Sequence, residues 1–107
     1  MRNYLKYLSD TMYLFQRQYK LTDNQLKFLL FICDERGSFT KRSIREGMYA
    51  SKNFHEVKFP ALVKEDYIFV FERRLWNSSQ PNKYRVTNKT IRLVNKFYNV
   101  LEGQEEM

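Results

Sequence analysis

Hydrophobic residues recur at helical spacing at both ends of the chain and in its second segment. Residues 2–19 and 88–102 each carry apolar positions three or four residues apart, with polar positions between them. Residues 23–36 contain the run KFLLFIC and are apolar almost all round. The pattern therefore predicts two amphipathic outer helices and a buried central helix. The apolar side of the last helix is expected to comprise Ile91, Val94, Phe97, Tyr98 and Leu101.

The middle of the chain predicts two further helices followed by a hairpin. The helices are expected at residues 40–47 and 51–65, each preceded or opened by a hydroxyl residue that can cap it. Residues 67–75 are rich in β-branched and aromatic types, and residues 76–82 in turn formers. Residues 83–86 can pair back as the second strand of an antiparallel hairpin.

Several single residues are expected to set the boundaries of these elements. Thr22 is a candidate N-cap for the second helix, and Thr87 or Asn88 for the last one. Gly37 can end the second helix in the left-handed conformation. Pro60 falls inside the helix predicted at residues 51–65, where it removes a backbone donor and should kink or restart the helix.

This order of elements is typical of a winged helix-turn-helix. The expected fold is mainly α (α+β), with about five helices and an antiparallel wing of two strands, or three if Ser38 and Phe39 add a short one. The 107 residues allow one domain. Its winged core is expected at residues 22–87, flanked by outer helices at residues 1–19 and 88–102.

The positive charge is concentrated on the segment that such a fold presents to a partner. The chain has a net charge of +7; residues 36–96 carry +9, residues 1–35 carry +1 and residues 97–107 carry −3. Neutralising phosphates releases counterions, which is the main sequence-independent source of affinity for DNA. The charge therefore favours double-stranded DNA as partner. The alternative is a basic surface that serves only solubility.

A winged helix-turn-helix places its second helix in the DNA major groove and its hairpin on the flanking backbone. Here these are helix 51–65 and wing 68–87. If Phe54, Val57 and Ala61 point inward, the opposite face presents side chains that can contact bases or phosphates. These are Lys52, Asn53, His55, Glu56 and Phe59. Further cations on the helix-turn-helix entry and the wing are Lys41, Arg42, Arg73, Arg74, Lys83 and Arg85.

Each helix residue has a chemistry suited to DNA. Asn53 can pair with adenine, and Lys52 can reach guanine or phosphate. His55 can donate a hydrogen bond to guanine or to phosphate, and Phe59 can lie against a thymine methyl group. Glu56 can accept from cytosine or disfavour contacts made only with phosphate. The alternative for each is a solvated helix face. If the helix instead starts near Phe59, with the following proline in its first turn, the assignment largely fails.

Residue types for catalysis are sparse. His55 is the only histidine and Cys33 the only cysteine, and the cysteine lies in the most apolar helix, where an inert thiol is expected. No group of His, Cys and carboxylates has the spacing of zinc ligands. The glycines Gly37, Gly47 and Gly103 are too far apart for a phosphate-binding loop. We therefore expect no enzyme, no metal and no cofactor.

Neither a membrane nor a secretory route is indicated. The longest uninterrupted apolar stretch, Phe28–Cys33, has six residues, far below the roughly 20 that span a bilayer. The first ten residues, MRNYLKYLSD, lack the apolar region of a signal peptide. A single cysteine agrees with a reducing compartment. The expected location is the cytoplasm.

Three stretches carry a likeness to known regulators: LTDNQLKFLLFICDERGSFTKRSIREG, SKNFHEVKFPALVKEDYI and YRVTNKTIRLVNKFYNVLEG. In this order they resemble the helix-turn-helix entry, recognition helix, and wing with dimerisation helix of MarR/SarA-type winged-helix regulators. The resemblance covers nearly the whole chain and implies a homodimeric transcription regulator. It departs at the wing tip, where residues 78–81 (SSQP) replace the family's acidic residue and arginine. Arg74, Lys83 or Arg85 would have to substitute, or the wing contacts only backbone.

The outer helices carry more apolar residues than one core stripe requires: Leu5 and Tyr13 on the first, Leu93 and Val100 on the last. This surplus predicts a homodimer, the alternative being that the helices pack only on each other. A second class of function stays open, because many winged helices bind proteins instead of DNA. The strand NKYRVT resembles wings of plasmid and phage replication initiators, so the alternative is a protein-interaction or replication-assembly module of a phage or mobile element. The sequence shows no polar cluster that would mark a small-molecule effector site.

Overall fold

The computed structural model describes residues 4–33, 38–41, 51–73 and 82–103. These residues form a mainly helical α+β domain with four helices and a two-stranded antiparallel hairpin after the third helix, an arrangement consistent with a winged helix. The elements, in chain order, are α1 (Tyr4–Tyr19), α2 (Asp23–Cys33), the π-helical segment η1 (Phe54–Lys58), α4 (Phe59–Lys64), β1 (Ile68–Glu72), β2 (Lys83–Val86) and α5 (Asn88–Leu101). Residues 52 and 53 are helical as well, so η1 and α4 belong to one continuous helix, here called helix 52–64.

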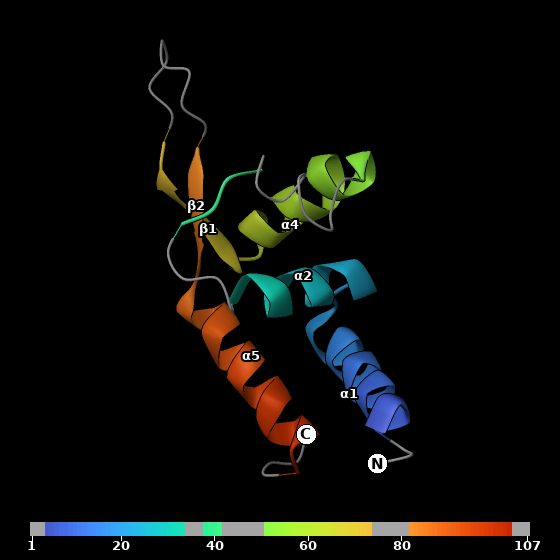
Figure 1. Cartoon of the computed structure of the whole chain (residues 1–107). Helices are drawn as coiled ribbons and strands as arrows, with labels where there is room; N and C mark the ends of the chain where they lie inside the picture. The colour runs from blue at the N-terminus through green and yellow to red at the C-terminus, as the bar shows by residue number, and fades with distance from the viewer. Residues whose placement is uncertain (1–3, 34–37, 42–50, 74–81, 104–107) are drawn as a thin grey trace.

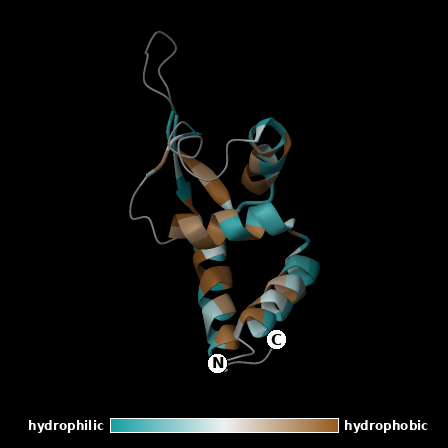
Figure 2. Ribbon diagram, turned by 45° about the vertical axis from the view of Figure 1, so that its right-hand side comes forward, coloured by the Kyte–Doolittle hydropathy of each residue, from teal (hydrophilic) through white to brown (hydrophobic). Residues whose placement is uncertain are grey.

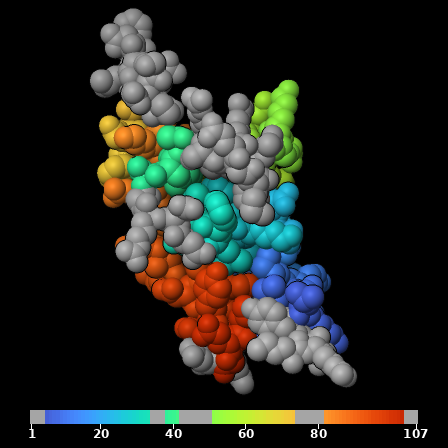
Figure 3. Space-filling model, viewed as in Figure 1, coloured from blue at the N-terminus to red at the C-terminus, as the bar shows by residue number. Residues whose placement is uncertain are grey.

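Helix α2 lies across the middle of the molecule and separates two ends of different character (Figure 1). The hairpin and helix 52–64 lie on one side of α2, and α1 and α5 extend from the other side (Figures 1 and 3). The two outer helices pack on each other through an edge-to-face contact between Phe15 and Phe97, with ring centroids 5.2 Å apart. The Tyr7 hydroxyl also donates a hydrogen bond to the Val100 carbonyl oxygen at 2.9 Å.

The core is built around the ring of Phe28 in α2. It makes edge-to-face contacts with Phe39, Phe54 and Phe59, at centroid distances of 5.9, 5.2 and 6.1 Å. Tyr84 of β2 closes the cluster against Phe59 at 5.0 Å. Burying each such ring contributes about 2–3 kcal/mol, so this cluster holds the helices and hairpin together. The prediction of a buried central helix is confirmed.

The hairpin pairs Ile68 with Val86 and Val70 with Tyr84, and a bulge follows between Val70 and Glu72. Phe39 forms an isolated β-bridge to Tyr84, in which its N–H and C=O exchange hydrogen bonds of 2.9 and 2.8 Å with that residue. The prediction that residues 38 and 39 add a short strand beside the wing is confirmed only for this single bridge at Phe39, and the sheet has two strands. Because the bridge joins β2 to the chain that follows α2, it fixes the hairpin to the helical core.

The helix starts follow the predicted caps. The Thr22 hydroxyl accepts from the Gln25 N–H at 3.2 Å, and the Gln25 side chain accepts from the Thr22 N–H at 2.9 Å. This reciprocal pair is a capping box and satisfies two backbone donors at the start of α2. Thr87 caps α5 by accepting from the Thr90 N–H, which decides between the two predicted caps.

Two helices end with a non-glycine residue in the left-handed region. Lys20 (φ 56°) follows α1, and Asp66 (φ 67°) follows helix 52–64. After the second of these helices, the Tyr67 N–H bonds to the Leu62 carbonyl and the Asp66 N–H to the Val63 carbonyl. This pattern is the Schellman motif, which satisfies the last free carbonyls of a helix and turns the chain toward β1.

The predicted inward face of helix 51–65 is wrong in part. Phe54 is buried as expected, but Val57 is 53% exposed. His55 and Phe59, expected on the DNA-facing side, are only 4% and 1% exposed. The reason is the π-helical turn, in which the Phe59 N–H donates to the Phe54 carbonyl five residues earlier. The wider turn brings both phenylalanines to the same inward face.

Pro60 lies in the first turn of α4, directly after this π turn. Because proline has no N–H, it cannot donate the helical hydrogen bond to the residue four positions earlier. The π turn just before it shifts the hydrogen-bond register, and the helix continues. The sequence predicted a kink or a restart at Pro60; the structure instead shows a change of hydrogen-bond register just before it, and the helix runs through Phe59. The structure therefore combines features of the two alternatives: the helix begins at residue 52, and its hydrogen-bond pattern changes at Phe59.

The apolar face of α5 is also rotated from the prediction. Leu93, Val94, Phe97 and Val100 are buried, whereas Ile91 and Tyr98 are exposed. The rotation follows from Thr90, which is fully buried and donates through its hydroxyl to the Tyr67 carbonyl at 2.5 Å. This contact turns the Leu93 side of α5 toward the core. Leu93 and Val100 were expected at a dimer interface, and that assignment is wrong.

Other predictions lie outside the described residues. These concern most of helix 40–47, the helix end at Gly37 and the turn at residues 76–82, except for its last residue. In the described parts of the chain, no helix combines the length and apolar character needed to cross a membrane.

Candidate nucleic-acid interface

Helix 52–64 presents one continuous solvent-exposed stripe. Its members recur at helical spacing on the side opposite Phe54 and Phe59. They are Lys52, Asn53, Glu56, Val57, Pro60 and Lys64. The stripe combines two cations, an amide, a carboxylate and two apolar side chains. Such a mixture can both bind phosphate and discriminate between base edges.

Three of the five helix residues predicted to face DNA lie on this stripe: Lys52, Asn53 and Glu56. His55 and Phe59 do not, because both are packed inside the protein. Val57 was missed, since regular α-helical spacing assigns it to the core. It now supplies the exposed apolar group that was expected from Phe59. Only knowledge of the π turn would have found it from the sequence.

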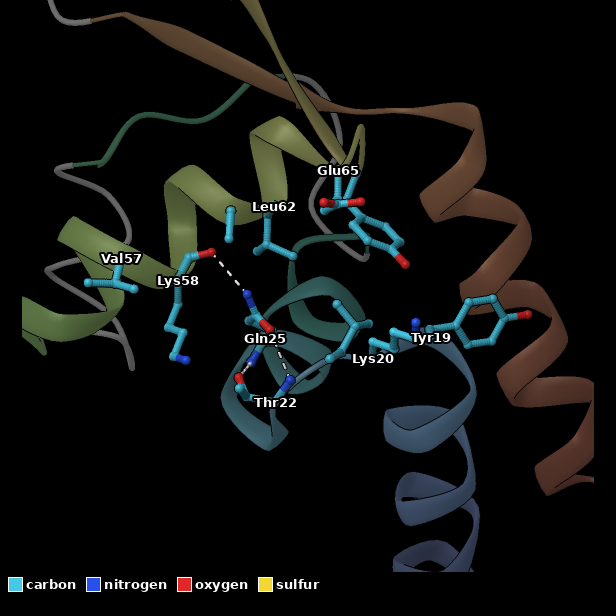
Figure 4. A pocket seen from close by; sticks show the side chains of 11 residues that line it. Tyr19, Lys20, Thr22, Gln25, Val57, Lys58, Leu62 and Glu65 are labelled. Atoms are coloured by element: carbon cyan, nitrogen blue, oxygen red, sulfur yellow. Dashed lines mark hydrogen bonds between the residues drawn. The ribbon is translucent and has the colours of Figure 1, made fainter.

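Gln25 positions the π turn on α2. Its Nε2 donates a hydrogen bond to the Lys58 carbonyl oxygen at 3.1 Å, while its Oε1 accepts from the Thr22 N–H (Figure 4). The Gln25 residue is buried, and both bonds are half-buried at the edge of a cavity. The exposed stripe is therefore carried by a helix that is fixed in rotation by the core rings and by this amide.

Lys41 lies beside the same helix. Its ammonium nitrogen is 5.1 Å from the centroid of the Phe59 ring, and the residue is half-buried. A cation over an aromatic face is attracted by the ring quadrupole. Phe59 therefore supports the predicted site by holding a cation and not by touching a base. Arg42, the neighbouring predicted residue, lies outside the described part of the chain.

The hairpin carries the remaining described cations of the predicted site. Arg73 is exposed, and the Arg85 guanidinium lies 3.5 Å from the centroid of the Phe71 ring. The Lys83 ammonium forms an ion pair of 3.4 Å with Glu72. Lys83 is thus partly neutralised, whereas the two arginines keep their charge available to solvent. Arg74 lies outside the described residues.

A cavity of about 500 Å³ opens between the α1–α2 turn and helix 52–64 (Figure 4). Its lining mixes apolar groups such as Leu62 with the cations of Lys20 and Lys58 and the carboxylate of Glu65. Tyr67 also lines it, and burial raises the pKa of its phenol, with smaller contributions from Tyr19 and Glu65. This mixed lining does not select one ligand chemistry.

Within the described ranges, no three His, Cys, Asp or Glu side chains lie close enough together to hold a metal ion. The chain matches no protein-family model, no curated protein and no solved structure. What can be said of function therefore rests on the fold and on the helix and hairpin just described. Together they form a small α+β domain, consistent with a winged helix, that exposes basic and polar side chains at one end.

Proposed function

We propose that this protein is a sequence-specific, double-stranded DNA-binding transcription regulator that acts as a homodimer. The observation that carries the proposal is the exposed stripe of helix 52–64, which lies on the same side of α2 as the cationic hairpin (Figure 1). In a winged helix, a helix and a hairpin so arranged contact the major groove and the adjacent backbone. The net charge of +7 supports a polyanionic partner.

In this proposal the first turns of helix 52–64 read the bases. Asn53 can donate to and accept from one adenine, and Glu56 can accept from a cytosine amino group. Val57 replaces Phe59 as the candidate contact for a thymine methyl group. Lys52 and Lys64 lie nearer the two ends of the stripe, where they can bind phosphates and set the register.

The outer helices supply the proposed dimer interface. Large hydrophobic side chains that stay exposed in one subunit are Leu5, Tyr7, Tyr13 and Leu14 on α1 and Ile91 and Tyr98 on α5. Leu5 is the most exposed of them at 77%, and large exposed apolar patches often mark interaction surfaces. A two-fold axis through the end of the molecule formed by α1 and α5 would present two copies of helix 52–64 to DNA half-sites about 34–36 Å apart.

The reading role is tested with Asn53→Ala on a selected genomic site and on a scrambled duplex, at one fixed salt concentration. We expect a loss of about 1–3 kcal/mol on the selected site and almost none on the scrambled one. The Asn53 side chain makes no capping hydrogen bond to η1, so the variant should keep its stability. Asn24→Ala, an exposed change on α2 away from the stripe, is the matched control.

Equal losses on both duplexes would refute base reading by Asn53. Wild-type protein that shows no salt-dependent binding to any duplex would refute DNA binding itself. It would favour the protein-interaction or replication-assembly function, for which the exposed side chains of α1 would be the docking surface.

The dimer is tested by sedimentation at micromolar concentration. We expect the wild type at twice the 13.2 kDa of the chain, and Leu5→Asp/Tyr13→Lys at the monomer mass. Aspartate is tolerated at Leu5 because this residue lies in the first turn of α1, where a negative charge favours the helix. Asn24→Asp on α2 is the control. A wild type that sediments at 13.2 kDa would contradict the dimer.

A further inference from the structure

The hairpin has an aromatic outer face that the core does not use. Ile68 of β1 is buried and Val70 half-buried on the inner face, whereas Phe69 and Phe71 are 41% and 44% exposed. Figure 2 shows the contrast along the hairpin, with β1 mainly hydrophobic and β2 mainly hydrophilic. Two large rings are therefore presented to solvent side by side on one strand.

A planar cation completes this face from the opposite strand. Arg85 is the cross-strand partner of Phe69, and its guanidinium lies 3.5 Å from the centroid of the Phe71 ring. The ring attracts the guanidinium through its quadrupole, which favours this position of the side chain and reduces the entropy that a ligand contact would otherwise cost. We call these three residues, Phe69, Phe71 and Arg85, the outer hairpin face.

We propose that the outer hairpin face binds the unpaired bases of a single-stranded nucleic acid. Aromatic rings beside arginine form the usual stacking platform for such strands, because every base offers a flat π face and every nucleotide a phosphate. In a duplex the base faces are covered by neighbouring pairs and are not accessible to the rings. The proposal goes beyond the duplex binding assigned to helix 52–64 and does not depend on it.

The spacing of the two rings agrees with this partner. Phe69 and Phe71 are two residues apart on β1, which in a regular strand is about 6.6 Å, roughly twice the 3.4 Å rise of a stacked nucleic-acid strand; Phe71 lies at the bulge, where the strand bends. Two successive bases can stack on both rings only if they are unstacked from each other, which a flexible single strand allows. A purely apolar peptide would leave Arg85 without a counter-charge, whereas a phosphate supplies one.

The test is fluorescence anisotropy with a labelled 12-nucleotide oligo-dT, an oligo-rU and a blunt duplex of equal length. We expect Phe69→Leu/Phe71→Leu to weaken binding to the single strands by about tenfold per ring, because leucine stays apolar but cannot stack. Affinity for the duplex should fall much less, because there only the phosphate contact of Arg85 depends on Phe71. Phe31→Leu, which alters an equally exposed ring on α2, is the matched control. Phe69→Tyr/Phe71→Tyr keeps the rings and should restore the affinity.

Unchanged single-strand binding in the double leucine variant would overturn the proposal, as would a wild type that binds neither oligonucleotide. Comparison of oligo-dT with oligo-rU shows whether the strand is DNA or RNA. Poly-glutamate that binds equally well to the wild type and the leucine variant, and displaces the oligonucleotides, would show an acidic-peptide site instead. The Asn53→Ala experiment measures binding to duplex DNA, whereas the leucine variants are tested on single strands. Failure of this proposal and failure of the proposed function therefore give different results.

Discussion

The side-chain amide of Gln25 donates a hydrogen bond to the carbonyl oxygen of Lys58 at 3.1 Å. The bond joins the first turn of α2 to the π turn of helix 52–64, residues that are 33 positions apart. The other end of the same amide accepts from the Thr22 N–H. One side chain thus caps a helix and fixes the rotation of the candidate reading helix.

Replacement of Gln25 separates these two roles. Gln25→Glu keeps an acceptor for the Thr22 N–H but has no N–H to donate to Lys58. We expect it to lower the free energy of unfolding by about 1–3 kcal/mol, because it leaves a buried acceptor without its donor and sets a carboxylate against a carbonyl. Urea unfolding measures the change. Asn24→Glu, one position earlier and exposed, is the control. Equal stability of the two variants would contradict the importance of the bond.

Lys20→Gly should stabilise the protein. Lys20 has φ 56° at the end of α1, a conformation that costs a side-chain-bearing residue about 1–2 kcal/mol and glycine almost nothing. Part of this stabilisation is offset because glycine also makes the unfolded chain more flexible. We therefore expect a net increase of about 0.5–1 kcal/mol in the free energy of unfolding, measured by heat or urea.

Gln18→Gly, two residues earlier in the regular part of α1, is the matched control for Lys20→Gly. It should destabilise the protein by about 0.5–1 kcal/mol, because the helical conformation gives glycine no advantage there. The two substitutions are thus expected to have opposite signs. A decrease of stability in both would show that the left-handed residue is not strained.

Tyr67 should make stability sensitive to alkaline pH. Burial raises the pKa of its phenol above the ordinary value of 10.0, with smaller effects from Tyr19 and Glu65. In the unfolded chain this tyrosine ionises near pH 10, so below that pH its titration does not change the free energy of unfolding. As the pH rises from 10 through the higher pKa of the folded state, the free energy of unfolding falls.

The measurement is the urea midpoint of the wild type and of Tyr67→Phe between pH 9 and pH 11. The wild type should lose stability more steeply, because phenylalanine has no proton to release on unfolding. If Tyr67→Phe loses stability as steeply as the wild type, the phenol is not responsible.

The cations of the wing should hold DNA without reading it. Replacement of all four by alanine should weaken binding to every duplex alike and lower the salt-dependence slope by about one unit for each phosphate that is no longer bound. They are Arg73, Arg74, Lys83 and Arg85. Among single variants, Arg73→Ala should reduce the slope more than Lys83→Ala, because Lys83 is paired with Glu72.

Lys6→Ala, on the exposed side of α1 at the other end of the molecule, is the control for the wing variants. Its salt dependence should equal that of the wild type. Discrimination between selected and scrambled sites should survive in all of these variants, since phosphate contacts carry no sequence information. An unchanged slope in the quadruple variant, with its helix content intact by circular dichroism, would mean that the wing does not touch DNA.

Local sequence features predicted the described elements well. The capping box at Thr22, the cap at Thr87 and the β-rich segments around the turn formers all act over a few residues. Their effect is therefore visible in the sequence itself. The same holds for the exposure of Lys52, Asn53 and Glu56, which are charged or polar and lie near the start of their helix.

The faces of two helices were decided by tertiary contacts. In helix 52–64, a regular period of 3.6 residues assigned Val57 to the core and His55 and Phe59 to the surface. The structure reverses these assignments, because the rings of Phe54 and Phe59 both pack on Phe28 and a π turn accommodates both.

The sequence by itself determined where the described helices and strands begin, how they are capped and that the chain is strongly basic. Only the tertiary structure decided which sides of helix 52–64 and α5 remain exposed. The physical reason is that the rotation of a helix is set by partners distant in sequence. Gln25 and Phe28 set it for helix 52–64, and the bond from Thr90 to Tyr67 sets it for α5. Local periodicity carries no information about these contacts.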